Sequence, residues 1–375
     1  MLWHRLPIHE DKIQILAEDQ RHFPFAPPTT VTSQETPINM SAYCMEDYNH
    51  EERVECRNKL LRSLQKDGFA LITGTGLSVT QCRNALKATD SFFNEAGEKV
   101  RRSCLAKDRA RRGYSPLNSE NFASLVGNVA PNDLVRKFRV GAVDGKLGQS
   151  PLHRPNTWPS CEYWDEDKAS YFQKSIQEFY TSISKASHAV VDAIREALSN
   201  MESLNEDNLQ VMGENISHTS ILTLLGYKKG ARHQGKMKRP LVAPHTDVGV
   251  ITVLLFDAGG CAVLQRANND QSKSEPENNI WTDVNLPNIS TLSDPVLVVN
   301  IGDCLSEISG GALPSTLHRV QPSPGEVRRN CLAFFVGLAP EAKLMLPNRC
   351  SPMSYEEWRK ERIQKASDVM NKGKE

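Results

Sequence analysis

The side chains best suited to do chemistry lie in the last third of the chain. His245 and Asp247 stand two residues apart in the stretch A-P-H-T-D-V-G-V-I-T-V-L-L-F, and His318 follows in S-T-L-H-R-V. Two histidines and one carboxylate form the facial triad of non-haem Fe(II) sites, which leaves one face of the metal open. Zn(II) is the alternative ion for the same donor set. We therefore predict a metal site at these three residues.

The spacing of the first two candidates has a physical interpretation. Residues two apart in a strand point to the same face of a sheet. The apolar run that follows Asp247 predicts one strand over residues 246–256. We therefore expect His245 and Asp247 to reach one metal from a single strand without a kink. His318 must come from a distant strand, which a rolled sheet allows.

Arg329 is the fourth candidate and lies eleven residues after His318. It precedes Cys331, Ala333 and Phe335 at a period of two, so these four side chains share one face while Arg328 points the other way. An inward guanidinium can hold a carboxylate with paired hydrogen bonds. The alternative is an ordinary surface arginine.

Three motifs in the same region identify a family resemblance. V-N-I-G-D ends a predicted strand at Asp303, L-H-R-V contains His318, and R-x-x-L-A-F-F begins at Arg329. In this order they resemble the Fe(II)/2-oxoglutarate dioxygenases of the isopenicillin N synthase-like family. The resemblance implies an α+β fold whose core is an antiparallel double-stranded β-helix, or jelly roll, with flanking helices. Short strands separated by turns after residue 218 favour the same architecture.

The resemblance also assigns roles to residues around Arg329. In the family, an R-x-S pair and an upstream tyrosine hold the far carboxylate of 2-oxoglutarate. Here the serine position is Cys331, whose thiol is a weaker hydrogen-bonding group than a hydroxyl. Tyr227, at the end of L-T-L-L-G-Y, matches the tyrosine position. The alternative for Tyr227 is ordinary packing within a strand.

The reaction implied is an oxidation of a small molecule by O2 with Fe(II) and 2-oxoglutarate, releasing succinate and CO2. The outcome is hydroxylation, desaturation or cyclisation, and ascorbate is expected to stimulate it. Two alternatives stay open: an Fe(II) oxidase of the same fold that does not use 2-oxoglutarate, and a non-catalytic jelly-roll protein that binds metal. Succinate formation coupled to substrate turnover distinguishes the three.

The chain is predicted to divide into four regions. Residues 1–35 read as an N-terminal arm, 36–200 as the N-terminal dioxygenase region with supporting helices, 201–350 as the jelly-roll core, and 351–375 as a C-terminal helix or tail. Apolar residues at three- and four-residue steps predict helices over 51–66 and 164–198. A buried strand is predicted over 69–73, after Gly68 at the end of the first helix.

Composition limits the kinds of partner and the cellular compartment that we expect. Lys plus Arg and Asp plus Glu each number 45 in 375 residues, so the net charge is zero and gives no reason to expect a nucleic-acid or membrane partner. Nine cysteines without a CxxC pair read as reduced thiols. The first twenty residues lack the apolar segment of a signal peptide. We expect a cytoplasmic monomer whose partners are a small-molecule substrate and O2.

The basic segment 101–112 allows two interpretations. It holds Arg101, Arg102, Lys107, Arg109, Arg111 and Arg112. We favour a solvated helix face and loop, which is the usual environment of such a run. The other interpretation is electrostatic capture of an anionic substrate.

Overall fold

Two β-sheets form the centre of the protein. The computed structural model describes residues 36–45, 48–107, 112–126, 130–142, 154–199, 206–214, 219–228, 239–257, 260–268, 280–323, 328–347 and 349–372. An eight-stranded sheet has the order β1-β2-β10-β7-β12-β5-β4-β3, and a four-stranded sheet has the order β6-β11-β8-β9. Apart from the parallel pair β1–β2, the pairings within these two sheets are antiparallel. The predicted jelly-roll core is confirmed.

The strands are short, as predicted. In the larger sheet they are β1 (Ile38–Asn39), β2 (Phe69–Thr73), β3 (Gly113–Ser115), β4 (Arg136–Val140), β5 (Ile221–Tyr227), β7 (Ile251–Phe256), β10 (Leu297–Ile301) and β12 (Arg329–Phe335). In the smaller sheet they are β6 (Val242–His245), β8 (Ala262–Ala267), β9 (Trp281–Val284) and β11 (His318–Pro322). A separate pair is β13 (Lys343–Leu344) and β14 (Met353–Ser354).

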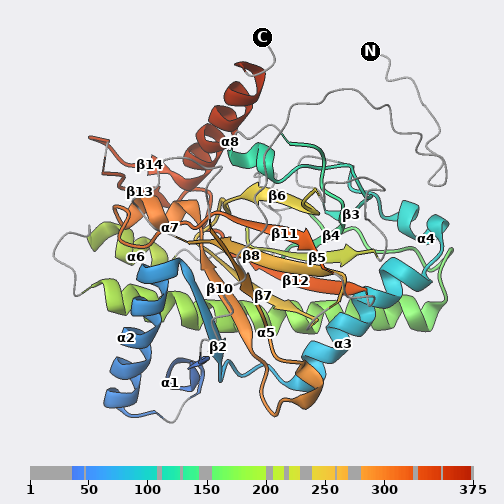
Figure 1. The fold of residues 1–375 in the computed structure, drawn as a ribbon, viewed down its shortest axis with the longest axis horizontal. Helices are drawn as coiled ribbons and strands as arrows, with labels where there is room; N and C mark the ends of the chain where they lie inside the picture. The colour runs from blue at the N-terminus through green and yellow to red at the C-terminus, as the bar shows by residue number, and fades with distance from the viewer. Residues whose placement is uncertain are drawn as a thin grey trace.

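Helices cover the outer face of the larger sheet. The helices are α1 (Ser41–Cys44), α2 (His50–Asp67), α3 (Val79–Asp90), α4 (Glu98–Ser103), α5 (Glu166–Leu198), α6 (Glu206–Glu214), α7 (Asp303–Ile308) and α8 (Tyr355–Lys372). In Figure 1, α5 runs along one side of the large sheet while α8 projects from the opposite side. Among the described residues, no helix is both long enough and apolar enough to cross a bilayer.

The two main helix predictions are confirmed. Asn49 caps α2 by accepting a hydrogen bond from the Glu52 amide, and Gly68 ends it in the left-handed region with φ of 67°. Asp165 caps α5, whose apolar stripe packs into the same hydrophobic cluster as the outward residues of β5, β7 and β12. His188 is exposed, as expected for a histidine on the outer side of this helix.

The single strand predicted over 246–256 is wrong. β6 ends at His245 in the smaller sheet and β7 begins at Ile251 in the larger sheet. The chain turns between them, and the Val250 amide donates to the Val336 carbonyl at 2.9 Å. The chain leaves the smaller sheet after His245 and enters the larger sheet at Ile251, so residues 246–250 form a bend instead of continuing one strand. Helices α6 and α7 were not predicted.

The solvated interpretation of segment 101–112 is wrong at Arg112 and holds only in part at Arg101, whose side chain is 12% exposed. Arg102 on α4 is exposed and pairs with Glu98, as a solvated face requires. Arg112 is only 3% exposed and lies against Gly141. Arg109 and Arg111 fall outside the described residues. Arg112 is buried at the point where β3 begins and pairs with β4 at the edge of the large sheet.

Candidate metal and co-substrate site

The three predicted metal ligands come together between the two sheets. His318 at the start of β11 lies opposite His245 at the end of β6. Asp247 Oδ1 lies 3.9 Å from His245 Nε2 and 3.8 Å from His318 Nε2. The ligand atoms all lie within 4.8 Å of one another, and each side chain is buried. One ion could therefore be shared by all three.

Backbone carbonyls orient both imidazole rings. His245 Nδ1 lies 2.9 Å from the Ala243 carbonyl oxygen, and His318 Nδ1 lies 3.1 Å from that of Thr316. A carbonyl oxygen only accepts hydrogen bonds, so each Nδ1 carries the proton and each Nε2 presents a lone pair. This arrangement is common behind metal-binding histidines.

Asp247 is oriented in the same way. Its Oδ2 accepts hydrogen bonds from Thr252 Oγ1 at 2.6 Å and from Asn300 Nδ2 at 2.9 Å. These two donors occupy Oδ2, so Oδ1 is left to face the two histidines. Thr252 lies on β7 and Asn300 on its neighbour β10, which places the supporting groups on the rigid sheet.

The local electrostatics favour the protonation states that a cation needs. Burial lowers the pKa of His245, and the neighbouring His318 lowers it further. Burial alone would raise the pKa of Asp247, but the two histidines and the hydrogen bonds from Asn300 and Thr252 lower it overall. Neutral imidazoles beside a carboxylate are a donor set that suits Fe(II).

The physical reason predicted for the H-x-D spacing is therefore wrong, although the residues meet. His245 lies on β6, and Asp247 lies in the turn that leads from one sheet to the other. The Asp303 amide fixes this turn by donating to the Asp247 carbonyl at 2.7 Å. The turn, not strand alternation, brings the carboxylate beside the imidazole.

Arg329 lies in the same pocket as the triad. The pocket has a volume of about 480 Å³, including its open mouth. Arg329, Cys331, Ala333 and Phe335 all line it, which confirms the predicted common face of β12. Arg328 points away and pairs with Asp90 on α3.

The Arg329 guanidinium is buried and incompletely satisfied. It is 3% exposed, and Nη1 donates to the Ala262 carbonyl oxygen at 3.0 Å. Its Cζ lies 4.0 Å from the Phe256 ring centroid. Within the described ranges, Nε has no hydrogen-bond acceptor. A buried donor without an acceptor is costly, so this group is suited to an anion that enters the pocket.

Tyr227 and Cys331 flank this guanidinium. Tyr227 lies directly opposite Arg329 in the β5–β12 register, and Cys331 lies one inward position further along β12. Burial raises the pKa of the Tyr227 hydroxyl above its usual range and raises the pKa of the Cys331 thiol to about 12. Both groups are therefore neutral and present no negative charge to an anion.

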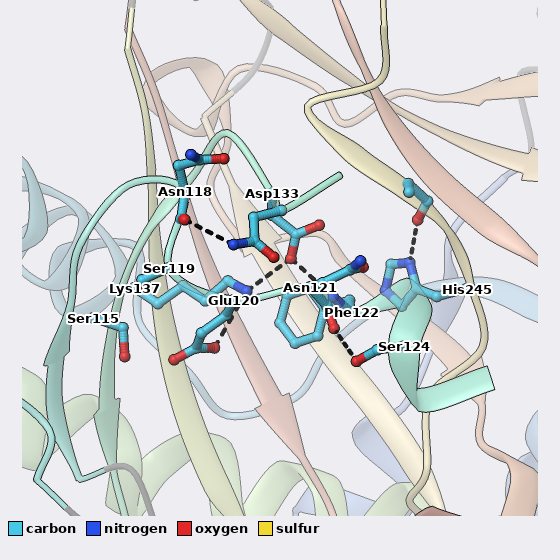
Figure 2. Close-up of polar contacts among 12 residues, drawn as sticks. Ser115, Asn118, Ser119, Glu120, Asn121, Phe122, Ser124, Asp133, Lys137 and His245 are labelled. Atoms are coloured by element: carbon cyan, nitrogen blue, oxygen red, sulfur yellow. Dashed lines mark hydrogen bonds and ion pairs between the residues drawn. The ribbon is translucent and has the colours of Figure 1, made fainter. Parts of the chain in front are cut away.

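Four contributors to the site were not predicted. Phe122 stacks on the His245 ring at a centroid distance of 5.2 Å, and Phe69 meets His318 edge-on at 5.8 Å. Figure 2 shows Phe122 beside His245. Thr252 and Asn300, which hold Asp247, are the other two. Asn300 lies in the N-I-G-D motif and Thr252 lies in the stretch that follows Asp247, so both stood in quoted motifs although neither was assigned a role.

Comparison with known proteins agrees with this geometry. A family model described as the non-haem dioxygenase in morphine synthesis N-terminal region matches residues 37–161. The model of the 2OG-Fe(II) oxygenase superfamily matches residues 227–338, which include His245, Asp247, His318 and Arg329. Together the two matches cover more than half of the chain. The chain belongs to the 2OG-Fe(II) oxygenase superfamily.

Relatives of this oxygenase occur among fungal enzymes. The 2-oxoglutarate-dependent dioxygenase traH of Penicillium crustosum is 27% identical over 321 residues, which cover 85% of this chain and 89% of the relative. Clavatol oxidase claD of the same species is 24% identical over 285 residues, or 72% of this chain and 76% of the relative. The reaction class of this oxygenase is the Fe(II)- and 2-oxoglutarate-dependent oxidation of a small molecule.

Solved structures share its fold. A full-length Neurospora crassa protein in complex with alpha-KG superposes with a TM-score of 0.67 at 18% identity, covering 88% of this chain and 95% of that one. A 2OG-Fe(II) oxygenase family protein from Caulobacter crescentus gives 0.66 at 22% identity, covering 89% and 99%. At these identities the likeness supports the fold alone.

Proposed function

We propose that this oxygenase binds Fe(II) through His245, Asp247 and His318 and binds 2-oxoglutarate against Arg329. The observation that carries the proposal is the buried Arg329 guanidinium, whose Nε lacks an acceptor in the described structure, in the same pocket as the triad. When bound, Fe(II) activates O2, and 2-oxoglutarate supplies two electrons as it is decarboxylated to succinate.

Each residue of the proposed co-substrate site has a separate task. Arg329 donates hydrogen bonds to the far carboxylate and balances its charge inside an apolar pocket. The neutral Tyr227 hydroxyl and Cys331 thiol complete the surroundings of that carboxylate without repelling it. Phe256 and Leu264 line the same pocket and exclude water from the co-substrate chain. The two Nδ1 contacts and the two donors to Asp247 keep the three ligand atoms aimed at one point.

The test is a screen for substrate-stimulated succinate. Purified protein is incubated with Fe(II), 2-oxoglutarate, O2 and ascorbate, which we expect to stimulate turnover, and a small-molecule library is added. We expect at least one compound to raise succinate formation in proportion to its own oxidation. His318→Ala should lower the rate of succinate formation at least about a hundredfold, because removing one of three ligands weakens metal binding directly.

The matched control is His188→Ala, which removes an exposed histidine on α5 and should leave the rate unchanged. Substrate oxidation without succinate would instead support an oxidase of the same fold. Full Fe(II)-dependent activity in His318→Ala would contradict the ligand assignment.

A further inference from the structure

A lysine is buried behind the aromatic ring that covers His245. Lys137 on β4 is 1% exposed, and its Nζ lies 3.6 Å from the centroid of the Phe122 ring. The Phe122 and His245 rings are nearly parallel, with 10° between their planes. In Figure 2 the Phe122 ring lies between the lysine and the imidazole.

One carboxylate holds both the lysine and the backbone of Phe122. Asp133 Oδ2 lies 2.8 Å from Lys137 Nζ and accepts a hydrogen bond from the Phe122 amide at 3.0 Å. Asp133 is itself 2% exposed. The His245 imidazole therefore covers one face of the Phe122 ring, and the Lys137 amino group covers the other. Asp133, the partner of Lys137, also holds the Phe122 backbone.

The charges around this ring balance. Glu120 Oε2 lies 3.4 Å from Lys137 Nζ and 2.5 Å from Arg139 Nη2, and these side chains are also buried. Two cations thus face two carboxylates. Removing an ammonium from water costs several kcal/mol, which close ionic partners and hydrogen bonds offset. The ionic partners of Lys137 fix it behind Phe122 and keep it out of the pocket.

We propose that Phe122 is the specificity-determining residue on the substrate side of the metal site, and that Lys137 and Asp133 are positioning residues that hold its ring. The substrate group admitted beside the metal is uncharged and apolar, with an aromatic ring favoured. This inference rests on the proposed function, because it takes the pocket around His245 as the place of oxidation.

Beyond the part of the pocket assigned to 2-oxoglutarate, around Arg329, Phe256 and Leu264, the remaining lining supports an uncharged group. Apart from the triad and Arg329, the pocket is lined by apolar side chains, Tyr227, Cys331 and Thr252. Arg329 is assigned to the co-substrate, and the Phe122 ring separates Lys137 from the pocket. The edge of an aromatic ring carries partial positive charge, so the exposed edge of Phe122 would meet the face of another ring favourably.

The first experiment measures the position of the ring without metal. The ring current of Phe122 should shift the ring protons of His245 in the NMR spectrum of the metal-free protein. Phe122→Leu should abolish this shift, and Phe122→Tyr should keep it. Lys137→Met should reduce it by half or more if the ammonium positions the ring.

A matched control uses a second cation that lies over an aromatic ring. The Cζ of Arg53 on α2 lies 4.2 Å from the centroid of the Tyr43 ring, and the same side chain forms an ion pair with Glu196 on α5. Arg53 therefore makes the same two kinds of contact in another part of the fold. Arg53→Met should leave the His245 shift unchanged. If Lys137→Met folds poorly, Lys137→Met/Asp133→Asn removes both charges and keeps an acceptor for the Phe122 amide. An unchanged shift in the folded variant overturns the positioning role.

The second experiment exposes the buried charge. Protein loaded with Zn(II) and saturating 2-oxoglutarate is titrated with toluene and with benzoate, observed by ligand NMR. Wild type should bind toluene and not benzoate. Phe122→Ala should gain benzoate binding by at least about tenfold, which is about 1.4 kcal/mol. Phe122→Ala/Lys137→Met should lose that gain.

The outcomes separate the inference from the proposed function. If wild type takes up neither Zn(II) nor 2-oxoglutarate while the His245 shift responds as expected, the proposed function fails and the role of Lys137 stands. If Zn(II) and 2-oxoglutarate bind but wild type prefers benzoate to toluene, the specificity role of Phe122 fails. If Phe122→Ala gains no benzoate binding, the proposed separation of Lys137 from the pocket fails.

Discussion

Arg328 and Arg329 are adjacent in sequence and have opposite environments. Arg328 has a side chain 49% exposed and pairs with Asp90 at the surface, whereas Arg329 is buried beside Phe256 and faces the triad. The difference follows from alternation at the start of β12, because Arg328 directly precedes the strand and successive side chains of extended chain point to opposite faces. The chain thus contains a matched pair for testing the role of a guanidinium in the pocket.

Arg329→Ala should weaken 2-oxoglutarate binding by about a hundredfold or more. Removing one partner of a buried charge pair leaves the other unpaired, at a cost of about 3 kcal/mol or more. The measurement is anaerobic titration of the Fe(II) protein with 2-oxoglutarate, followed by the visible charge-transfer band. Fe(II) affinity should be nearly unchanged.

Arg328→Ala is the control for that titration and should bind 2-oxoglutarate as wild type does, since exposed ion pairs contribute little. Cys331→Ser places a hydroxyl where the thiol lies and should keep or tighten binding. Equal affinities in Arg329→Ala and Arg328→Ala would remove the basis for the co-substrate assignment.

At the scale of elements, the turn between β6 and β7 depends on Asp303 at the start of α7. The Asp303 carboxylate accepts hydrogen bonds from Thr246 Oγ1 at 3.2 Å and from Ser315 Oγ at 2.7 Å. Arg362 on α8 donates to the same carboxylate from Nη2 at 2.7 Å and from Nε at 3.0 Å. Through Asp303, the C-terminal helix is therefore connected to the two segments that carry the proposed metal ligands.

Arg362→Gln should destabilise the protein by about 2 kcal/mol, because hydrogen bonds to a charged group contribute about 1.5–3 kcal/mol. It should also weaken Fe(II) binding by about tenfold, as expected when groups that orient metal ligands are lost. Urea unfolding and anaerobic Fe(II) titration measure the two effects.

The neighbouring Lys360→Gln is the control for Arg362. Lys360 forms an exposed pair with Glu356 within α8, and its loss should change neither quantity measurably. Loss of stability with unchanged Fe(II) affinity in Arg362→Gln would mean that α8 supports the fold without ordering the turn between β6 and β7 that carries Asp247.

At the scale of the whole molecule, the outer helices and the pocket occupy opposite faces of the large sheet. One hydrophobic cluster joins α5, α3 and α2 to the outward residues of that sheet, and a second cluster lies between the two sheets around the pocket. Phe172 on α5 is fully buried in the first cluster and stacks on Phe92 at 4.9 Å. Packing on this side of the sheet should affect the free energy of unfolding more than it affects co-substrate binding or catalysis.

Phe172→Ala should lower the free energy of unfolding by about 3–5 kcal/mol, because it leaves a large cavity in a packed core. In the fraction that remains folded, the dissociation constant for 2-oxoglutarate should stay within about twofold of wild type. Chemical unfolding and the anaerobic titration provide both numbers.

Its neighbour Tyr171 is 37% exposed, and Tyr171→Ala should cost less than about 1 kcal/mol. A co-substrate affinity that falls together with stability in Phe172→Ala would show that the helical face and the pocket are coupled.

The sequence by itself determined the features that depend on local geometry. The inward row from Arg329 to Phe335 follows from alternation along one strand, and the limits of α2 and α5 follow from capping residues and apolar periodicity. The order of the motifs was sufficient to predict the family and the jelly roll. The alternation, capping and periodicity signals each lie within a few residues of the feature that they predict.

Only the tertiary structure decided which distant groups meet. The turn between the sheets, the Asp303 contacts with α8 and the placement of Lys137 behind Phe122 all join segments that are separate in sequence. The predicted strand over 246–256 failed for the same reason. An apolar run records that its residues are buried, but the point at which the chain passes from one sheet to the other is set by long-range strand pairing.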